Sequence, residues 1–496
     1  MLIPAITFGP TRANDVDDAR VLEFLDKISV LGPVIVSIED LDENATEQEA
    51  NRLLLKRIID KTNTNSLTPC YLEGLKIDQD ELATQLLDAG LHGIFFRQPA
   101  PAETLELELL SKVLASFPRA RVGVSVHISE ALAAGPAQAV AEYIERVVAA
   151  NRANAIHYYV QVHTSSQQVL EAVRDVAKAL VQRSTSLLDN VQLYLGIPPA
   201  LPRSTKMAAK ISTSTTDNTI HAVFRPRPLT DPAATSSSSS SSSNSGSAGE
   251  GGIDLPEDGV DTLSAFISCI RSDRPDGLFT TVVCDEHGVS LGLVYSNDVS
   301  IRAAVHEKKG IYWSRSRGGL WRKGDSSGMY QELLAVALDC DGDALRFTVV
   351  QHGTPPAFCH LMTRTCWGDV HGLQHLQSIL RARLVGAPEG SYTKRLFTDH
   401  TLLKKKLVEE AQELAEATTH DDVAGEAADL MYFLMTRCVA AGVSLRDIER
   451  KLDDRSLKVT RRPGNAKAWR DENAAKILAG GVTTGAEGDL LPGSQP

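Results

Sequence analysis

Two groups of residues in the second half of the chain have side chains and spacings that suit metal-dependent chemistry. The first group combines cysteines with an aspartate-rich string and comprises Asp339, Cys340, Asp341, Asp343, Cys359, His360 and Cys366. The second group consists of two carboxylate pairs, Glu410 with Glu413 and Glu426 with Asp429. Thiolates are preferred ligands of zinc, whereas magnesium prefers oxygen ligands such as carboxylates. The sequence therefore predicts two different metal sites on neighbouring segments.

The three cysteines of the first group are candidate zinc ligands. Three protein ligands with one open position are typical of a catalytic zinc ion, which lowers the pKa of a bound water molecule. We interpret Cys340, Cys359 and Cys366 in this way, and three buried free cysteines are the alternative. On a β-strand His360 would point away from Cys359, so we assign it as a proton-transfer base and not as a fourth ligand.

The aspartates of the first group form a candidate magnesium site. On a strand, Asp339 and Asp341 would share one face, and the turn signal at Gly342 could bring Asp343 back toward the same ion. The string differs from a calcium-binding loop, because its glycine is in the fourth place instead of the sixth and Val350 is in the twelfth. Magnesium is therefore the better interpretation.

A stretch rich in glycine, serine and arginine, residues 313–328, precedes the first group. Glycine backbone N–H groups and arginine side chains both suit phosphate oxygens, so we predict a substrate-binding loop. Its predicted contacts are Trp313, Ser314, Arg315, Ser316, Arg317 and Lys323. A solvated turn is the alternative.

The second group places four carboxylates on two predicted helices. Residues three apart share a helix face, so two antiparallel helices could gather Glu410, Glu413, Glu426 and Asp429 around magnesium. Magnesium there would neutralise a triphosphate and orient an attacking water. A solvated acidic face is the alternative, but apolar neighbours such as Phe433 put these carboxylates beside apolar surface, where a charge needs a partner.

The hydrophobic periodicity predicts the elements that position both groups. Residues 260–370 show short strand-like runs separated by turns, which indicates a β-rich module. Residues 373–452 are helical in pattern, with long periodic segments at 401–418 and 422–442. Composition separates these modules from the first half of the chain, because eight consecutive serines occupy 236–243 and such sequence behaves as a flexible linker.

The first half alternates strand-like runs with helix-like stretches, which predicts an α/β domain with a mainly parallel sheet. The strand-like runs are 34–38, 93–96, 122–126, 158–162 and 191–195, and the helix-like stretches are 103–116, 136–150 and 166–184. We find no glycine-rich phosphate loop here and interpret His127, His157 and His163 as core or surface histidines. The predicted domains are an α/β domain of unknown role at 1–225, a linker at 226–255, a β-rich module at 256–370, an all-α module at 371–470 and a disordered tail at 471–496.

Composition limits the partners and the compartment. The net charge of −12 over 496 residues disfavours nucleic-acid binding, which needs a basic face. Seven cysteines, an odd number in a long chain, favour a reducing compartment over a disulfide framework. We find neither a signal peptide nor a run of eighteen apolar residues, so we expect a cytoplasmic protein with small-molecule partners and no membrane span.

Five short motifs in one order make the first module specific. They are Gly292–Asn297, Tyr312–Gly318, Leu320–Gly324, Asp339–Asp341 and Phe358–His360. This segment resembles phosphoribosyl-AMP cyclohydrolase of histidine biosynthesis, a family that hydrolyses the N1–C6 bond of the adenine ring. The resemblance implies zinc on the three cysteines, magnesium near the three aspartates, and a homodimer, since the family completes its zinc site across a dimer interface.

The helical module carries a second resemblance. Its E-x-x-E…E-x-x-D carboxylates and the motifs Pro388–Thr393, Lys406–Ala411 and Ala428–Tyr432 are similar to phosphoribosyl-ATP pyrophosphohydrolase, an all-α nucleotide-binding family. That family cleaves the α–β phosphate link, and its product is the substrate of the cyclohydrolase. The resemblance makes Lys394, Arg395 and Lys406 candidate phosphate contacts, although each alone would be read as a surface cation.

The layout as a whole resembles the multifunctional histidine-biosynthesis proteins of fungi, without their histidinol dehydrogenase domain. It implies a bifunctional hydrolase that uses Zn²⁺ and Mg²⁺ to convert phosphoribosyl-ATP to phosphoribosyl-AMP and then open the adenine ring. Two alternatives stay open. One is a house-cleaning nucleotide pyrophosphatase with a structural zinc module, and the other is a nucleotide sensor without turnover.

Overall fold

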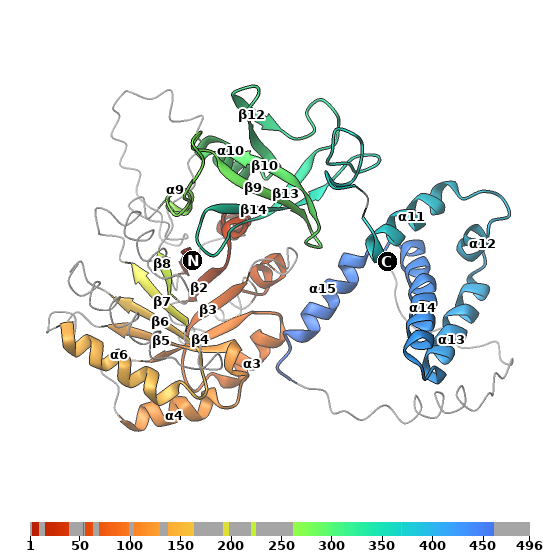
Figure 1. Ribbon diagram of the computed structural model, residues 1–496. Coiled ribbons are helices and arrows are strands. Elements are labelled where there is room, and N and C mark those ends of the chain that lie inside the picture. Colours follow the sequence, from red (N-terminus) through yellow and green to blue (C-terminus); the bar gives the residue numbers. More distant parts are fainter. Residues whose placement is uncertain are drawn as a thin grey trace. The chain divides into compact units, whose positions relative to one another are not determined.

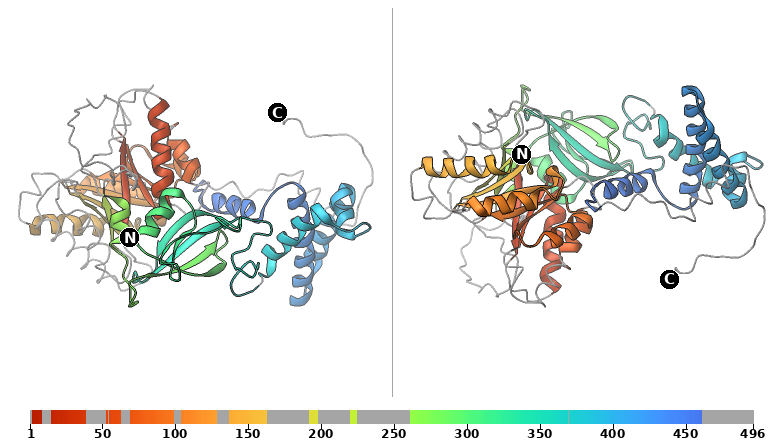
Figure 2. Two further views of the ribbon diagram at one scale, coloured as in Figure 1. Left: turned by 90° about the horizontal axis from the view of Figure 1, so that it is seen from above. Right: turned by 90° about the horizontal axis from the view of Figure 1, so that it is seen from below.

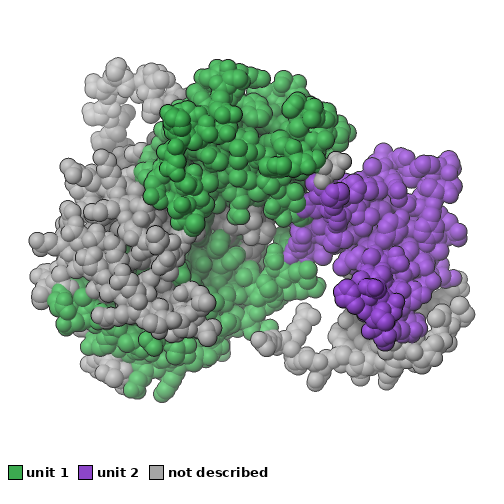
Figure 3. Space-filling model, viewed as in Figure 1, with its two compact units in different colours: residues 1–369, 450–460 green, residues 370–449, 461–496 purple. Residues whose placement is uncertain are grey.

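The structure is a computed structural model that divides into two compact units. It describes residues 2–8, 15–38, 53, 55–62, 69–98, 104–128, 137–162, 192–197, 220–224, 261–368 and 370–460. Unit 1 comprises Met1–Asp369 with Arg450–Thr460, and unit 2 comprises Val370–Glu449 with Arg461–Pro496 (Figure 3). The predicted linker 226–255, the predicted tail 471–496, the predicted helix at 166–184 and His163 lie outside the described residues.

Eight parallel strands in the first half of the chain close into a barrel (Figure 1). They are β1 (Leu2–Phe8), β2 (Val34–Ile38), β3 (Cys70–Leu75), β4 (Gly93–Gln98), β5 (Val122–Ile128), β6 (His157–Val162), β7 (Gln192–Ile197) and β8 (Ile220–Phe224). Each strand pairs with the next in the sequence. The pairing of Leu2 with Ala222 joins the first strand to the last and closes the sheet.

Helices cover the outside of this barrel. They are α1 (Asp15–Ile28), α3 (Asp80–Asp88), α4 (Thr104–Leu114) and α6 (Ala137–Asn151), with short 3₁₀ helices η1 (Ser29–Leu31) and η2 (Arg119–Arg121). In Figure 1, α4 and α6 lie outside the strands, at the lower edge of the barrel. Outward strand residues such as Val36 and Val124 pack with helix residues such as Leu110 and Ile144 in one large core. The predicted α/β class with a parallel sheet is confirmed for this region.

A β-rich module follows in unit 1. Its elements are α9 (Thr262–Ile267), β9 (Phe279–Asp285), β10 (Ser290–Ser296), α10 (Asp298–Glu307), β11 (Ile311–Ser314), β12 (Gly319–Arg322), β13 (Gln331–Leu338) and β14 (Ala344–Gln351). The order in the larger sheet is β10-β9-β14-β13, and β11 and β12 form a separate hairpin. Alternate residues of β14, Leu345, Phe347 and Val349, are buried in the module's core, as expected for a strand with one covered face.

The β-rich module contacts the amino-terminal end of the barrel. Val30 and Leu31 of η1, which directly precedes β2, belong to the core of the module. The Nζ atom of Lys308, at the end of α10, lies 2.7 Å from a carboxylate oxygen of Asp26 in α1. In the same unit, Asp88 lies at the end of α3, shortly before β4 begins. It accepts hydrogen bonds from the backbone N–H groups of Val459 and Thr460. The described contacts therefore use the end of the barrel at which these strands begin.

Unit 2 is helical, as predicted. It contains α11 (Gly372–Gly386), α12 (Tyr392–Thr398), α13 (His400–Glu416) and α14 (His420–Ala440), and α15 (Leu445–Ser456) begins in it. Asp399 and Thr419 cap α13 and α14 by accepting hydrogen bonds from backbone N–H groups of the first turn. The three-residue connection between these helices makes them an antiparallel hairpin, whose long blue ribbons lie side by side in Figures 1 and 2.

None of the described helices taken singly combines the length and apolarity needed to cross a bilayer. Only as a pair, bent by 102° at their junction, do α14 and α15 have that length and composition.

Candidate active sites

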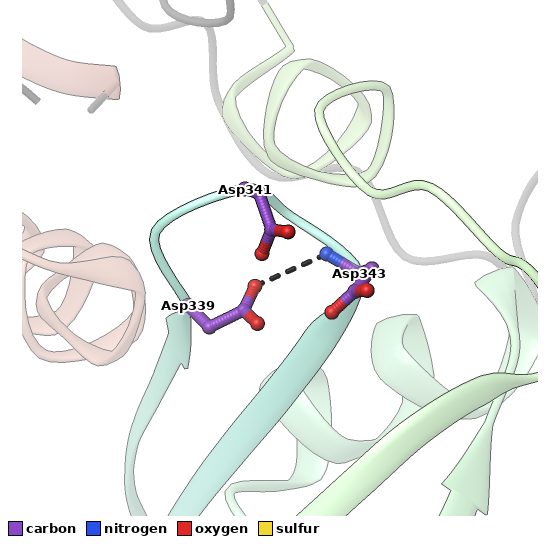
Figure 4. A group of neighbouring side chains, drawn as sticks. All are labelled: Asp339, Asp341 and Asp343. Atoms are coloured by element: carbon purple, nitrogen blue, oxygen red, sulfur yellow. Dashed lines mark hydrogen bonds between the residues drawn. The ribbon is translucent and has the colours of Figure 1, made fainter. Parts of the chain in front are cut away.

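The three aspartates of the first group meet in the turn between β13 and β14. Each offers a carboxylate oxygen within 4.8 Å of the others (Figure 4). One oxygen of Asp339 accepts hydrogen bonds from the backbone N–H groups of Gly342 and Asp343, at 2.9 and 3.1 Å. Gly342 has a φ of 80°, a conformation that suits glycine. The strand geometry expected for Asp339 and Asp341 is wrong, because β13 ends at Leu338, yet the turn brings the predicted ligands together.

The environment separates the protonation behaviour of these aspartates. Burial alone would raise the pKa of Asp339, but hydrogen bonds from the backbone of Ala344 and from its neighbours hold it below its usual value. The pKa of Asp343 is raised by its hydrogen bond with Asp339 and by the negative charges of Asp341 and Asp339. Three carboxylates this close repel one another, and a hard divalent cation is a partner that would relieve the repulsion.

Two of the three predicted zinc ligands lie together in the loop that follows β14. The thiols of Cys359 and Cys366 interact with each other. The loop is held to the sheet, since the N–H of Cys366 donates to the carbonyl of Leu291, at 2.8 Å. Cys340 lies in the aspartate turn, where its sulfur is 4.0 Å from a carboxylate oxygen of Asp341. Within the described part of a single chain, the three sulfur atoms do not all lie within 4.8 Å of one another, as the oxygens of the three aspartates do.

The two neighbouring thiols differ in acidity. The backbone N–H of Leu361 lowers the pKa of Cys359, whereas burial and the charge of Cys359 raise the pKa of Cys366. Burial lowers the pKa of Lys323, while the charges of both thiolates act in the opposite direction. The predicted substrate contact Lys323, one residue beyond β12, thus lies beside the cysteine pair. Its cation would favour the thiolate forms that bind zinc.

His360 lies beside Cys359, and the expectation that it points away is wrong. Its Nδ1 atom is 3.8 Å from the Cys359 sulfur. The chain forms a turn here, in which the N–H of Met362 donates to the carbonyl of Cys359 at 3.0 Å, so the alternation of side chains along a strand does not apply. The imidazole is therefore close to the thiol pair, where it could exchange a proton with a substrate.

The predicted substrate-binding loop is the β11–β12 hairpin. Trp313 and Ser314 end β11, and Arg315, Ser316 and Arg317 are exposed in the turn. Sequence reasoning gave no separate role to Tyr295, yet its ring is covered by two guanidinium groups. The Cζ atoms of Arg315 and Arg274 lie 4.1 and 4.3 Å from its centroid. Its place in the Gly292–Asn297 motif is the signal that could have pointed to it.

The second group of carboxylates meets between α13 and α14. Glu410 from α13 and Glu426 and Asp429 from α14 offer oxygens within 4.8 Å of one another. Glu413 lies one turn beyond Glu410, and burial together with the charges of Glu410 and Glu426 raises its pKa. The structure thus gathers three of the four predicted ligands and places the fourth within their electrostatic field.

Cations around this carboxylate group already have partners in the chain. The Nζ atom of Lys406 lies 2.8 Å from Glu410 and 2.9 Å from Glu409, and the hydrogen bonds that it donates to these carboxylates raise its pKa. Lys394 forms an ion pair with Glu389 on the surface. Behind the site, Thr393 connects the hydroxyl of Tyr432 to the guanidinium of Arg383 through hydrogen bonds of 3.0 and 3.1 Å.

Comparison with known proteins supplies an independent line of information. The family model for phosphoribosyl-AMP cyclohydrolase matches residues 292–368, and the one for phosphoribosyl-ATP pyrophosphohydrolase matches residues 373–456. The histidine biosynthesis bifunctional protein HisIE of Photobacterium profundum is 35% identical over 209 residues, which are 39% of this chain and the full length of that protein. The chain belongs to the HisIE family. The candidate sites of both units therefore lie in the part that defines this membership.

Fungal members of the family are more similar in sequence. The histidine biosynthesis trifunctional protein of Kluyveromyces lactis is 56% identical over 205 residues, 41% of this chain and 26% of that protein. The histidine biosynthesis bifunctional protein his7 of Schizosaccharomyces pombe is 53% identical over 203 residues, 41% of this chain and 48% of that protein. The chain thus spans about a quarter of the first of these relatives and about half of the second.

Solved structures show only a weak likeness to part of the HisIE-family chain. The 7,8-dihydropteroate synthase from Vibrio fischeri ES114 covers 45% of it with 11% sequence identity and a TM-score of 0.30. A likeness this weak carries no conclusion about function.

Proposed function

We propose that the chain is a bifunctional hydrolase that performs two consecutive reactions on one phosphorylated nucleotide. The first converts phosphoribosyl-ATP and water to phosphoribosyl-AMP and pyrophosphate. The second adds water across the N1–C6 bond of the adenine ring and opens it. The observation that carries the proposal is that adjacent segments match the families of these two reactions and that each segment contains its own cluster of metal-type ligands.

The proposed division of labour follows these segments. We assign ring opening to residues 256–370 and pyrophosphate release to residues 371–470, with 226–255 as a linker and 471–496 as a tail. We assign neither reaction to the α/β domain at residues 1–225. Because both substrates are small and anionic, no nucleic acid is required as a partner, and we expect the protein to act in the cytoplasm.

For pyrophosphate release, Glu410, Glu426 and Asp429 would hold magnesium, with Glu413 beside them. Magnesium bound there would neutralise the phosphate chain and help to orient the attacking water. Burial and neighbouring charges raise the pKa of Glu413, so this carboxylate is the best placed of the four to accept a proton from that water. Lys394 could contact the substrate phosphates once it leaves Glu389.

For ring opening, Cys340, Cys359 and Cys366 would hold zinc, and Asp339, Asp341 and Asp343 would hold magnesium. Zinc in a thiolate site with an open position makes water nucleophilic near neutral pH. His360 lies close enough to the cysteine pair to move a proton between that water and the ring nitrogen. Arg315, Arg317 and the serines of the hairpin would bind the phosphate group of the substrate, and Trp313 pairs with Leu320 in the same hairpin.

A homodimer would complete the zinc site. One chain brings Cys359 and Cys366 together without Cys340, so the third thiolate would come from the partner chain. Apolar side chains near the cysteine pair support this, because Leu361, Met362 and Trp367 are 71%, 51% and 64% exposed. A cluster of exposed apolar residues of this kind marks an interaction surface.

The proposal is tested by incubating the purified chain with phosphoribosyl-ATP, Mg²⁺ and Zn²⁺ and separating the products by chromatography. Release of pyrophosphate together with the ring-opened ribotide supports it. Pyrophosphate release from unrelated nucleoside triphosphates at the same rate would favour a house-cleaning pyrophosphatase. Tight nucleotide binding without any product would favour a sensor.

A further inference from the structure

A polar cluster occupies the inside of the barrel toward the carboxyl ends of four neighbouring strands. Its members are Ser37 on β2, Glu73 on β3, Arg97 on β4, and Ser125 and His127 on β5. Strand pairing places Ser37 opposite Glu73 and Arg97 opposite Ser125. No part of the proposed hydrolase chemistry uses these residues.

The alternation of side chains directs this cluster into the barrel. Ile35, Phe95 and Tyr159 belong to a small buried cluster that is separate from the core beneath the helices, and it fills the barrel interior. Residues two positions apart share a face of a strand, so Ser37 follows Ile35 inward and Arg97 follows Phe95. The interior is therefore apolar at mid-height and polar in the next layer toward the carboxyl end.

Glu73 is the centre of the polar layer and is only 1% exposed. It accepts hydrogen bonds from the hydroxyls of Ser37 and Ser125, at 2.7 and 2.9 Å. The Nε2 atom of His127 lies 2.9 Å from the same carboxylate. Burial alone would raise the pKa of Glu73, but the hydrogen bond and charge of His127 and the other partners hold it below its usual value. Glu73 is therefore an anchored, ionised carboxylate.

Arg97 forms an ion pair with this carboxylate but stays partly exposed. Its Nε atom lies 3.7 Å from Glu73, which is an ion pair but not a hydrogen bond, and its side chain is 32% exposed. The Nε–H group is buried and finds no acceptor among the described residues. A partly exposed guanidinium, oriented by a fixed carboxylate, presents a fork that matches two oxygens of a carboxylate or phosphate group.

Stability alone gives little reason for such a layer. The interior layers of parallel eight-stranded barrels are dominated by branched apolar side chains, and a buried ion pair contributes little net stability compared with apolar packing. The carboxyl ends of the strands are also where barrels of this type carry their active sites. The described contacts of the β-rich module and of residues 459–460 use the opposite end of the barrel.

We propose that the carboxyl end of the barrel is a binding site for the anionic group of a small molecule, either a carboxylate or a phosphate monoester. The guanidinium of Arg97 binds the oxyanion, and Glu73, fixed by Ser37, Ser125 and His127, is its positioning residue. This site is separate from both hydrolase sites and does not depend on their assignment.

Calorimetric titration of the full chain with inorganic phosphate, and separately with acetate, tests the proposal. The variants are Arg97→Gln, which removes the charge, and Arg97→Lys, which keeps a cation for Glu73 but lacks the fork. Arg152→Gln is the matched control, because this exposed arginine lies between α6 and β6, at the amino end of the barrel. Far-UV circular dichroism reports whether each variant is folded.

We expect Arg97→Gln to weaken binding of one anion at least about tenfold, the effect of losing a charged hydrogen-bond donor. Arg97→Lys should give an intermediate loss, and it decides the matter if Arg97→Gln does not fold. Arg152→Gln should bind like the wild type. Loss of phosphate binding identifies a phosphate site, and loss of acetate binding identifies a carboxylate site. The proposal would be overturned if the wild type and both Arg97 variants bound each anion with the same affinity. It would also be overturned if the wild type bound neither anion.

Discussion

The ammonium group of Lys406 lies 2.8 Å from the carboxylate of Glu410, inside the group that would bind magnesium in the helical unit. Glu410 is only 5% exposed. Without a metal, Lys406 is therefore the cation that compensates the most buried ligand. Magnesium would have to compete with it, because a buried carboxylate attracts either positive charge.

This competition predicts the behaviour of Lys406→Met. Removing the ammonium should lower the magnesium concentration needed for half-maximal pyrophosphate release by about three- to tenfold, the effect of roughly 1 kcal/mol in a partly exposed ion pair. A magnesium titration of the initial rate measures it, with Lys404→Met, an exposed lysine on the same helix, as control. An unchanged or higher magnesium requirement would mean that Lys406 acts on the substrate.

The guanidinium groups around Tyr295 predict a substrate-affinity effect in the β-rich module. Tyr295→Leu removes the ring that orders Arg315, so KM for phosphoribosyl-AMP should rise about three- to tenfold, the size of a partly solvated cation–π contact. The turnover number should stay within about twofold of the wild-type value, because the lost contact binds the substrate and the transition state equally. Tyr295→Phe keeps the ring and should behave like the wild type. Equal defects in both variants would assign the effect to the hydroxyl group.

A zinc site shared between two chains predicts complementation between inactive variants. Cys340→Ala and Cys366→Ala should each lack ring opening. After subunit exchange of an equal mixture, about a quarter of the sites should be intact, because half of the dimers are mixed and each has one complete site. The ring-opening rate and the zinc content of the mixture measure this. A mixture as inactive as its components would place all three ligands in one chain.

The barrel interior predicts a loss of stability in mild acid. Burial lowers the pKa of His157 to about 4, whereas the pKa of a histidine in an unfolded chain is about 6.5. The folded state then binds fewer protons than the unfolded state, so this stabilisation is complete above about pH 6.5 and is lost as the pH falls toward 4.

Urea unfolding followed by far-UV circular dichroism between pH 7.5 and 4.5 (roughly the window set by these pKa values) tests this expectation. His157 should account for up to about 3 kcal/mol of the stability that the wild type loses across the window, and His92 and His221, whose pKa values burial also lowers, add to that loss in both proteins. His157→Gln, which cannot titrate, should start less stable because it disturbs the hydrogen bond to Tyr194, and its stability should depend less on pH. Parallel curves for the two proteins would contradict the assignment.

Local patterns predicted the candidate sites better than the fold of the first half. The aspartates were expected to converge because Gly342 marks a turn within a few residues. His360 was misplaced because the turn from Cys359 to Met362 has no comparable marker. The α/β class of residues 1–225 follows from periodicity, but closure of the barrel depends on pairing Leu2 with Ala222, which no local pattern specifies.

The polar layer in the barrel was missed for the same physical reason. Ser37, Ser125 and His127 lie 36, 52 and 54 residues from Glu73 in sequence. No spacing rule connects them, and His127 alone reads as an ordinary core histidine. Only strand pairing brings them onto one level of the barrel interior.

The central claim is that one chain carries two separable hydrolase sites, and product analysis of two variants tests it most directly. Wild type, Cys366→Ala and Glu426→Gln are each supplied with phosphoribosyl-ATP and, separately, with phosphoribosyl-AMP in the presence of Mg²⁺ and Zn²⁺. Cys366→Ala should accumulate phosphoribosyl-AMP from phosphoribosyl-ATP. Glu426→Gln should leave phosphoribosyl-ATP intact but open phosphoribosyl-AMP at the wild-type rate. If folded, metal-loaded wild type converts neither substrate, or if either substitution abolishes both reactions in a folded protein, the account of two independent sites is contradicted.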